Sequence, residues 1–251
     1  MIDHRIPNNW RALQEKVAEI FRDIGYLAET DKKLGTIRGS VNVDVFSADI
    51  TQSPNMIYVC ECKHWSRRVP KTVVHSFRTV MQDFGANYGL IISKKGFQKG
   101  AYEAAQNTNI KLVDWFDFQK MFEAKWLPAI SERVYDKCEM LISYTEPILG
   151  TSLVRKLDKI KSNREKKIAQ FKKLRQKYEV VGMTILHLRF ANFFRKNSQV
   201  IKLPVTLNIP KEKGDGCEAV EFFCLRNLLD CLLFWGEKGL KEFAEVFGET
   251  A

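Results

Sequence analysis

The sequence predicts an α/β fold for the first half of the chain and a mainly helical α+β region for the second half. Up to about residue 125, short β-branched and apolar runs alternate with segments of helical periodicity, the pattern of a sheet covered by helices. Further along, most periodic segments are helical. We expect the boundary near residues 125 to 130, which gives regions 1–125 and 126–251.

The first half opens with a helix at residues 9–24, where apolar side chains recur at helical spacing before Gly25 ends the helix. Residues 31–40 are charged and contain two glycines, which predicts a loop. The remaining predicted elements are strands at 41–46 and 57–63 joined by turn residues 51–55, a helix at 73–84, a strand at 88–92 and a helix from about 97.

The second half has weaker signals. Residues 116–126 are predicted to form a helix that Pro128 interrupts, and residues 180–190 fit a strand or a helix equally well. The other predicted elements are a helical segment at 129–146, a strand at 199–209 with a break at Pro204, a turn at 211–216, and helices at 219–235 and 238–247.

Three charged residues on the predicted hairpin carry the chemistry. Antiparallel pairing about a centre between residues 52 and 53 places Asp44 opposite Glu61, and Lys63 shares the face of Glu61 because side chains alternate along a strand. Two carboxylates can hold Mg²⁺, and a lysine can orient the water that attacks a phosphodiester. The sequence therefore predicts a nuclease site; the alternative is a solvated Glu-x-Lys charge pair on an exposed strand.

Five blocks in order resemble the Mrr-type catalytic domain of the PD-(D/E)xK restriction-endonuclease-like nucleases, over about residues 9–118. The blocks are Trp10–Tyr26 with its closing Gly-aromatic pair, Gly39–Val45, Cys60-Glu-Cys-Lys63, Gly85–Ala105 and Ile110–Asp114. The resemblance implies a central mixed sheet flanked by helices, catalytic residues Asp44, Glu61 and Lys63, and Mg²⁺ at the two carboxylates, for which Mn²⁺ may substitute.

The same resemblance places a supporting carboxylate of the first helix at Glu15 and implies hydrolysis that leaves a 5′-phosphate on DNA. It suggests a role in restriction or anti-phage defence, with repair as the second choice. A double-strand cut needs two sites, which favours a homodimer. Two other readings stay open: a catalytically silent DNA-binding or scaffold protein with a nuclease fold, and a nuclease effector activated by a partner or ligand.

Basic residues surround the predicted site. We expect phosphate contacts from six of these side chains: Arg38, Arg67, Arg68, Lys71, Lys94 and Lys95. For Arg38, a plain surface loop with no phosphate contact is an equally good explanation. Trp65 is a candidate for stacking, and His64 is a candidate for proton transfer. Gln82 is a candidate for a residue that approaches the site. For all three, an exposed or structural role is the alternative.

The net charge of +10 is concentrated in one segment. Residues 155–177 hold eleven Lys or Arg and two acidic residues, a net charge of +9. Such a stretch is typical of nucleic-acid contact, and a solvated helix face is the alternative. The DNA-binding residues proposed here are Lys166, Lys167, Lys172 and Lys173.

The six cysteines do not form a zinc or disulfide pattern. Cys60 and Cys62 flank Glu61 and should point into the core. Cys217, Cys224 and Cys231 repeat every seven residues, which would stack the last two along one helical face, and a buried stripe of reduced thiols is the prediction. The start of the chain lacks the apolar core of a signal peptide, and no apolar run approaches the ~20 residues of a membrane span. We therefore expect a soluble cytoplasmic protein that does not bind membranes.

Overall fold

The structure is a computed structural model that describes residues 1–146, 164–193, 201–214 and 216–248. Contacts divide the chain into two compact units, Met1–Ala129 and Ile130–Ala251. The elements that begin in the first unit are α1 (Trp10–Asp23), β1 (Leu27–Thr36), β2 (Gly39–Asp49), β3 (Met56–Lys63), α2 (Lys71–Phe84), β4 (Tyr88–Ser93), α3 (Lys99–Ala105), β5 (Ile110–Val113) and α4 (Trp115–Thr145).

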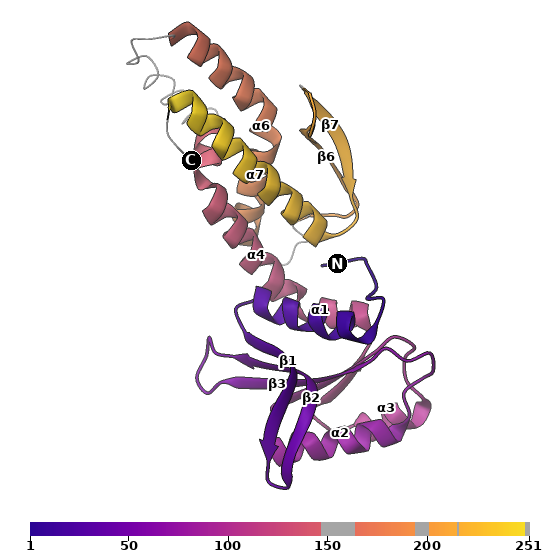
Figure 1. Cartoon of the computed structure of the whole chain (residues 1–251). Coiled ribbons are helices and arrows are strands. Elements are labelled where there is room, and N and C mark those ends of the chain that lie inside the picture. Colours follow the sequence, from indigo (N-terminus) through magenta and orange to yellow (C-terminus); the bar gives the residue numbers. More distant parts are fainter. Residues whose placement is uncertain (147–163, 194–200, 215, 249–251) are drawn as a thin grey trace. The chain divides into compact units, whose positions relative to one another are not determined.

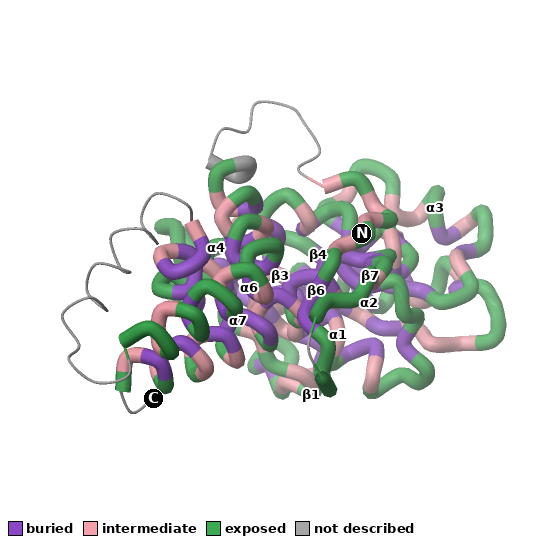
Figure 2. Tube along the Cα trace, turned by 90° about the horizontal axis from the view of Figure 1, so that it is seen from above, coloured by how far each residue is buried: buried purple, intermediate pink, exposed green. Residues whose placement is uncertain are grey.

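The first unit is a five-stranded mixed sheet between two helical layers. The strand order is β1-β2-β3-β4-β5; β2 is antiparallel to both β1 and β3, and β4 and β5 run parallel to β3. The helix α1 lies over one face, and α2 and α3 lie over the other (Figure 1). The predicted mixed sheet flanked by helices is confirmed. Because both faces are covered, β4 is buried at five successive residues (Figure 2).

The helix α1 is stabilised by a capped N-terminus and by an apolar face that packs against the sheet. The Asn9 side chain accepts a hydrogen bond from the Ala12 amide at 2.8 Å and so caps the helix N-terminus. Leu13, Val17 and Phe21 recur on the buried face. The Phe21 ring contacts aromatic rings of β3 and α4, which are Tyr58, Phe118 and Phe122.

On the other face, α2 contributes Val74, Phe77 and Met81 to an apolar cluster that includes Val59 of β3. The helix approaches β4 closely at Gly89, where an added Cβ would lie 2.7 Å from the Phe77 ring. A larger residue there would push α2 from the sheet.

Residues 31–40 do not form the predicted loop. Most of this stretch belongs to β1 and to the start of β2, which pair antiparallel from Leu27↔Ala48 to Thr36↔Gly39. The prediction failed because an edge strand with one solvated side needs few apolar residues. Leu34 is its buried apolar residue.

The second unit contains the rest of α4, then α6 (Arg164–Phe193), β6 (Val205–Pro210), β7 (Cys217–Phe222) and α7 (Leu225–Phe247). Three predictions here were wrong. The helix α4 continues through Pro128, residues 217–222 form a strand rather than the start of a helix, and α7 joins the two predicted C-terminal helices into one. Residues 180–190 are helical, and β6 begins directly after Pro204.

Helices of the second unit approach closely at small residues. An added Cβ at Gly236 of α7 would lie 2.3 Å from the Cys138 sulfur of α4. The Tyr144 and Phe243 rings stack with centroids 4.7 Å apart. The predicted thiol stripe is wrong, because Cys217 is exposed on β7 while Cys224 is buried at the start of α7. Among the described residues, no helix is both long and apolar enough to cross a membrane.

A buried carboxylate fixes the end of β2. Asp49 is 1% exposed, and its carboxylate accepts hydrogen bonds from the Thr51 amide at 3.0 Å and from Gln52 Nε2 at 2.8 Å. Lys125 Nζ lies 3.6 Å away. Burial acts to raise the pKa of Asp49, but the hydrogen bonds outweigh burial and lower that pKa to about 2.

We predict that Asp49→Ala lowers the free energy of unfolding by about 1–3 kcal/mol at pH 7, because the groups that donate to this buried carboxylate lose their acceptor. The lowered pKa means that the ionised Asp49 carboxylate stabilises the fold above its unfolded pKa of about 3.9, and this contribution fades as the pH falls toward 2. Urea unfolding at pH 7 and pH 3 should show a smaller difference from wild type at pH 3. Glu103→Ala, at an exposed pair on α3, is the control and should change stability by less than about 1 kcal/mol. An Asp49→Ala effect that is the same at both pH values would contradict the prediction.

Candidate active site

Asp44 lies where β2 and β3 separate. The ladder between the two strands runs from Asp49↔Met56 to Val45↔Cys60. This is the predicted register, in which Asp44 comes opposite Glu61 one position further. Beyond Val45 the Asp44 side chain replaces the backbone as hydrogen-bond acceptor, since its Oδ2 accepts a hydrogen bond from the Cys62 amide at 2.6 Å. The carboxylate thus occupies the place of a backbone acceptor at the end of the ladder.

The alternation of side chains shifts at the same point. Val43 and Phe46 both belong to the cluster on the α2 side of the sheet, although residues three apart on a regular strand point to opposite faces. Asp31, at the position of β1 that would face Asp44, has a left-handed backbone with φ of 50°. Both strands are therefore irregular beside the carboxylate.

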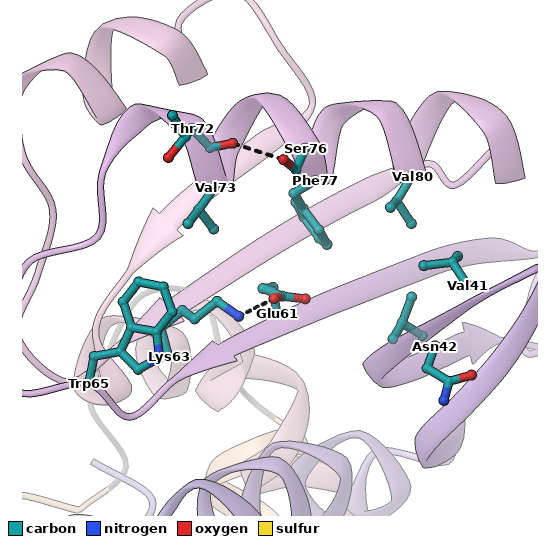
Figure 3. A pocket seen from close by; sticks show the side chains of 11 residues that line it. Val41, Asn42, Glu61, Lys63, Trp65, Thr72, Val73, Ser76, Phe77 and Val80 are labelled. Carbon is teal, nitrogen blue, oxygen red and sulfur yellow. Dashed lines mark hydrogen bonds and ion pairs between the residues drawn. The ribbon is translucent and has the colours of Figure 1, made fainter.

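Glu61 and Lys63 lie on one face of β3, as predicted, and form an ion pair (Figure 3). Their side chains are 24% and 16% exposed, so the pair is shielded from solvent more than a surface salt bridge. The neighbouring Cys60 and Cys62 are buried on the other face, which confirms their predicted orientation. Burial raises the pKa of both thiols.

Two groups act on the Glu61 carboxylate in opposite directions. Burial raises the pKa of Glu61, and the nearby negative charge of Asp44 raises that pKa further. The Lys63 ammonium lowers the pKa of Glu61 but does not cancel the rise. Asp44 and Glu61 are thus close enough to interact electrostatically, with one ammonium beside two carboxylates.

The helix residue that reaches the site is Gln14 and not Glu15. Gln14 is 3% exposed, and its Nε2 donates to Asp44 Oδ1 at 2.8 Å. The Glu15 side chain is 59% exposed and pairs with Arg22. The sequence held a signal for Gln14, since this polar residue lies among the buried Leu13, Val17 and Ala18 of α1. The predicted role of Glu15 is withdrawn because its side chain leaves the buried face.

A groove of about 330 Å³ begins at the Glu61–Lys63 pair and lies between α2 and the strands β2 and β3 (Figure 3). Its walls are about half apolar, and the polar groups come from the first turns of α2, from β2 and from the ion pair on β3. The lining residues are Val41, Asn42, Val43, Glu61, Lys63, Trp65, Thr72, Val73, Ser76, Phe77 and Val80.

The predicted phosphate-contacting residues near the site are on the surface. Five of them are exposed: Arg67, Arg68, Lys71, Lys94 and Lys95. The Lys94 amide donates to the Lys63 carbonyl at 3.1 Å, which brings the chain after β4 beside the end of β3. Arg38 is exposed at the β1–β2 turn, and its Nε lies 3.3 Å from Asp83 Oδ2.

Three secondary candidates differ in their placement. Trp65 lines the groove, and its ring lies 5.2 Å from Lys63 Nζ and 5.4 Å from Arg67 Cζ. His64 Nε2 donates to the Pro7 carbonyl at 3.1 Å, which gives this histidine a structural role. Gln82 is exposed and does not line the groove.

The described part of the basic segment lies on α6 in the second unit; residues 155–163 lie outside the described residues. One side of the helix is an apolar stripe, because Phe171, Leu174 and Tyr178 are buried. Lys166, Lys172 and Lys173 are exposed and Lys167 is half-buried. Lys177, by contrast, is held by Glu242 of α7 at 2.8 Å.

The first unit thus brings an Asp and a Glu-x-Lys pair together on a mixed sheet, beside a groove. Residues 7–122 match the family model Mrr_cat, a restriction endonuclease domain. This match is consistent with the resemblance of the region to the Mrr-type restriction-endonuclease-like family, and that family generally uses divalent metal ions.

The other comparisons add little. A crystal structure of a protein of unknown function, AF1548, is similar to this chain at 17% sequence identity with a TM-score of 0.39. The match covers 67% of this chain and 99% of that chain. No curated protein matches the chain.

The site fits a hard divalent cation. Two carboxylates interact unfavourably across a partly buried space, and the single Lys63 ammonium leaves a net negative charge there. Carboxylate oxygens are the ligands that Mg²⁺ and Mn²⁺ prefer. Asp44 and Glu61 are the residues that would hold such an ion.

We predict that the pKa of Glu61 responds to its two neighbours in opposite directions. In metal-free protein, Asp44→Asn should lower the pKa of Glu61 because a like charge is removed, and Lys63→Gln should raise that pKa because the ion pair is lost. The measurement is a ¹³C NMR titration of the Glu61 carboxyl. Glu15→Gln, at an exposed residue of α1, is the control and should leave the value unchanged. An unchanged pKa of Glu61 in Asp44→Asn would show that the two carboxylates are not coupled.

Proposed function

We propose that this protein is a metal-dependent DNA endonuclease whose active site is Asp44, Glu61 and Lys63. One observation carries the proposal: the Glu61–Lys63 pair lies on a shielded face of β3, beside the carboxylate that ends the β2–β3 ladder. A solvated charge pair would not require that shielding or a second interacting carboxylate.

Each residue has a distinct role in this proposal. Asp44 and Glu61 hold the divalent ion, and Gln14 and the Cys62 amide keep Asp44 oriented. When bound, Mg²⁺ or Mn²⁺ neutralises the scissile phosphate and lowers the pKa of the attacking water. Lys63 donates to that water or to the phosphoryl oxygens, where negative charge develops. Water adds to phosphorus, the bond to the 3′-oxygen breaks, and the products carry a 5′-phosphate and a 3′-hydroxyl.

The surrounding charge supports a nucleic-acid substrate. Exposed cations follow the ends of β3 and β4 along the chain, at Arg67, Arg68, Lys71, Lys94 and Lys95, and such side chains position the phosphate backbone without reading the bases. The exposed lysines of α6 would add affinity of the same kind. A defence role in restriction, and a homodimer that cuts both strands, are part of this proposal.

We predict that Asp44→Ala or Lys63→Ala reduces Mg²⁺-dependent plasmid nicking at least about a hundredfold, because each removes a positioned catalytic group. EDTA should abolish nicking by wild type. Circular dichroism and urea unfolding check that the variants fold.

The matched control is Glu15→Ala, which removes an exposed carboxylate one residue from Gln14 and should retain wild-type nicking. A wild-type protein that binds DNA but cuts neither DNA nor RNA with Mg²⁺ or Mn²⁺ favours the silent scaffold. Cleavage that appears only with a cellular extract or small ligand favours the activated effector.

We also predict that the quadruple replacement of Lys166, Lys167, Lys172 and Lys173 by glutamine weakens DNA binding similarly for all sequences, since phosphate contacts carry no base information. Each lost contact should reduce the salt slope by about one unit. Cleavage at saturating protein should stay near the wild-type rate.

The control for this variant removes four other exposed lysines and the same net charge: Lys99, Lys111, Lys120 and Lys241, each replaced by glutamine. It should bind more tightly than the α6 variant. Equal binding by the two variants across salt concentrations would show that α6 contributes only its net charge.

A further inference from the structure

Part of the wall of the groove beside Lys63 is apolar, and apolar side chains do not bind a phosphate group. Val73, Phe77 and Val80 point from α2 into it, and Val41 closes it from β2 (Figure 3). Its volume of about 330 Å³ is at the lower end of small-molecule sites, which span ~300–1,000 Å³. An apolar wall next to catalytic charges suits the flat, weakly hydrated part of a nucleotide, which is the base.

The groove also offers a few polar groups and an aromatic ring. Asn42 and Thr72 line it, and the Ser76 hydroxyl, which donates to the Thr72 carbonyl at 3.1 Å, can still accept a hydrogen bond. Trp65 lies at the end nearest the ion pair, and its ring is close to the Lys63 and Arg67 cations. An indole at this place can stack on any base, because every base has a π-face.

We propose that this groove receives one nucleobase that has left the helical stack next to the scissile phosphate, so that nucleic acid with unpaired nucleotides is the preferred substrate class. The inference rests on the proposed function, because the phosphate at Lys63 brings the neighbouring base within reach. In an intact duplex the bases are stacked inside the helix, and filling the groove requires breaking a pair. A single-stranded or mismatched site avoids most of this cost.

The first test measures binding without turnover, in Ca²⁺. The probes are thymidine 5′-monophosphate and 2-deoxyribose 5-phosphate, which differ only in the base. Wild type should bind the nucleotide at least about tenfold more tightly, because only the nucleotide has a base to stack.

Two variants that fill the groove, Ser76→Trp and Val80→Phe, should remove this preference for the base. Ser76 is exposed and lines the groove, so its replacement leaves the core intact, and Val80→Phe gives a second test of the same space. The matched control is His75→Trp, one residue earlier on α2, which is exposed and does not line the groove.

The second test measures cleavage in Mg²⁺ of one sequence as a single strand, as a duplex with one mismatch and as a perfect duplex. Wild type and His75→Trp should cut the unpaired substrates at least about tenfold faster than the perfect duplex. Ser76→Trp and Val80→Phe should lose this difference while still cutting the perfect duplex.

The outcomes separate the two proposals. Equal cleavage of paired and unpaired substrates, or groove variants that behave like His75→Trp, overturns the base groove and leaves the nuclease in place. Base-dependent nucleotide binding that Ser76→Trp abolishes, in a protein that cuts nothing, overturns the proposed catalysis and supports the groove. Equal binding of the nucleotide and the sugar phosphate overturns the groove whatever the cleavage result.

Discussion

The hydrogen bond from the Cys62 amide to the Asp44 carboxylate is the contact on which the site depends. A sheet amide that loses its partner strand must find another acceptor, since an unpaired buried amide is costly. Asp44 supplies that acceptor at the end of the β2–β3 ladder, and Gln14 fixes the other oxygen of the same carboxylate. The group that ends the pairing is therefore also the proposed metal ligand. Glu61 and Lys63 lie beyond this point, where β3 no longer pairs with β2, and their side chains line the groove.

The apolar packing of the two helical layers against the sheet stabilises the fold and offsets the unfavourable burial of the charged site residues. Phe21 of α1 and Phe77 of α2 belong to apolar contacts on opposite faces of the same sheet, so the charged residues sit at one end of a well-packed core. Glu61 shows the cost, because burial and Asp44 both disfavour its ionised form. A bound divalent ion would offset that cost, which is why the same features that weaken the metal-free site suit it to binding a cation.

The second unit is stabilised independently of that chemistry. Its helices meet at Gly236 and through stacked rings such as Tyr144 and Phe243, while α6 presents its apolar stripe inward and most of its lysines outward. Lys177 is the exception, since it pairs with Glu242. A helix held in this way keeps its exposed cations fixed relative to one another, which suits contact with a regular phosphate backbone.

The sequence by itself determined the α/β core, the register of the β2–β3 hairpin, the shared face of Glu61 and Lys63 and the burial of the two cysteines that flank Glu61. These features follow from local periodicity, which records which residues share a face. Tertiary structure decided the rest. The polar stretch at 31–40 became β1 because β2 supplies its hydrogen bonds. The helix α4 continues through Pro128 because Trp126, Leu127 and Ile130 are buried on both sides of the proline. Gln14 replaced Glu15 because only the packing of α1 against the sheet fixes which of two neighbouring side chains meets Asp44.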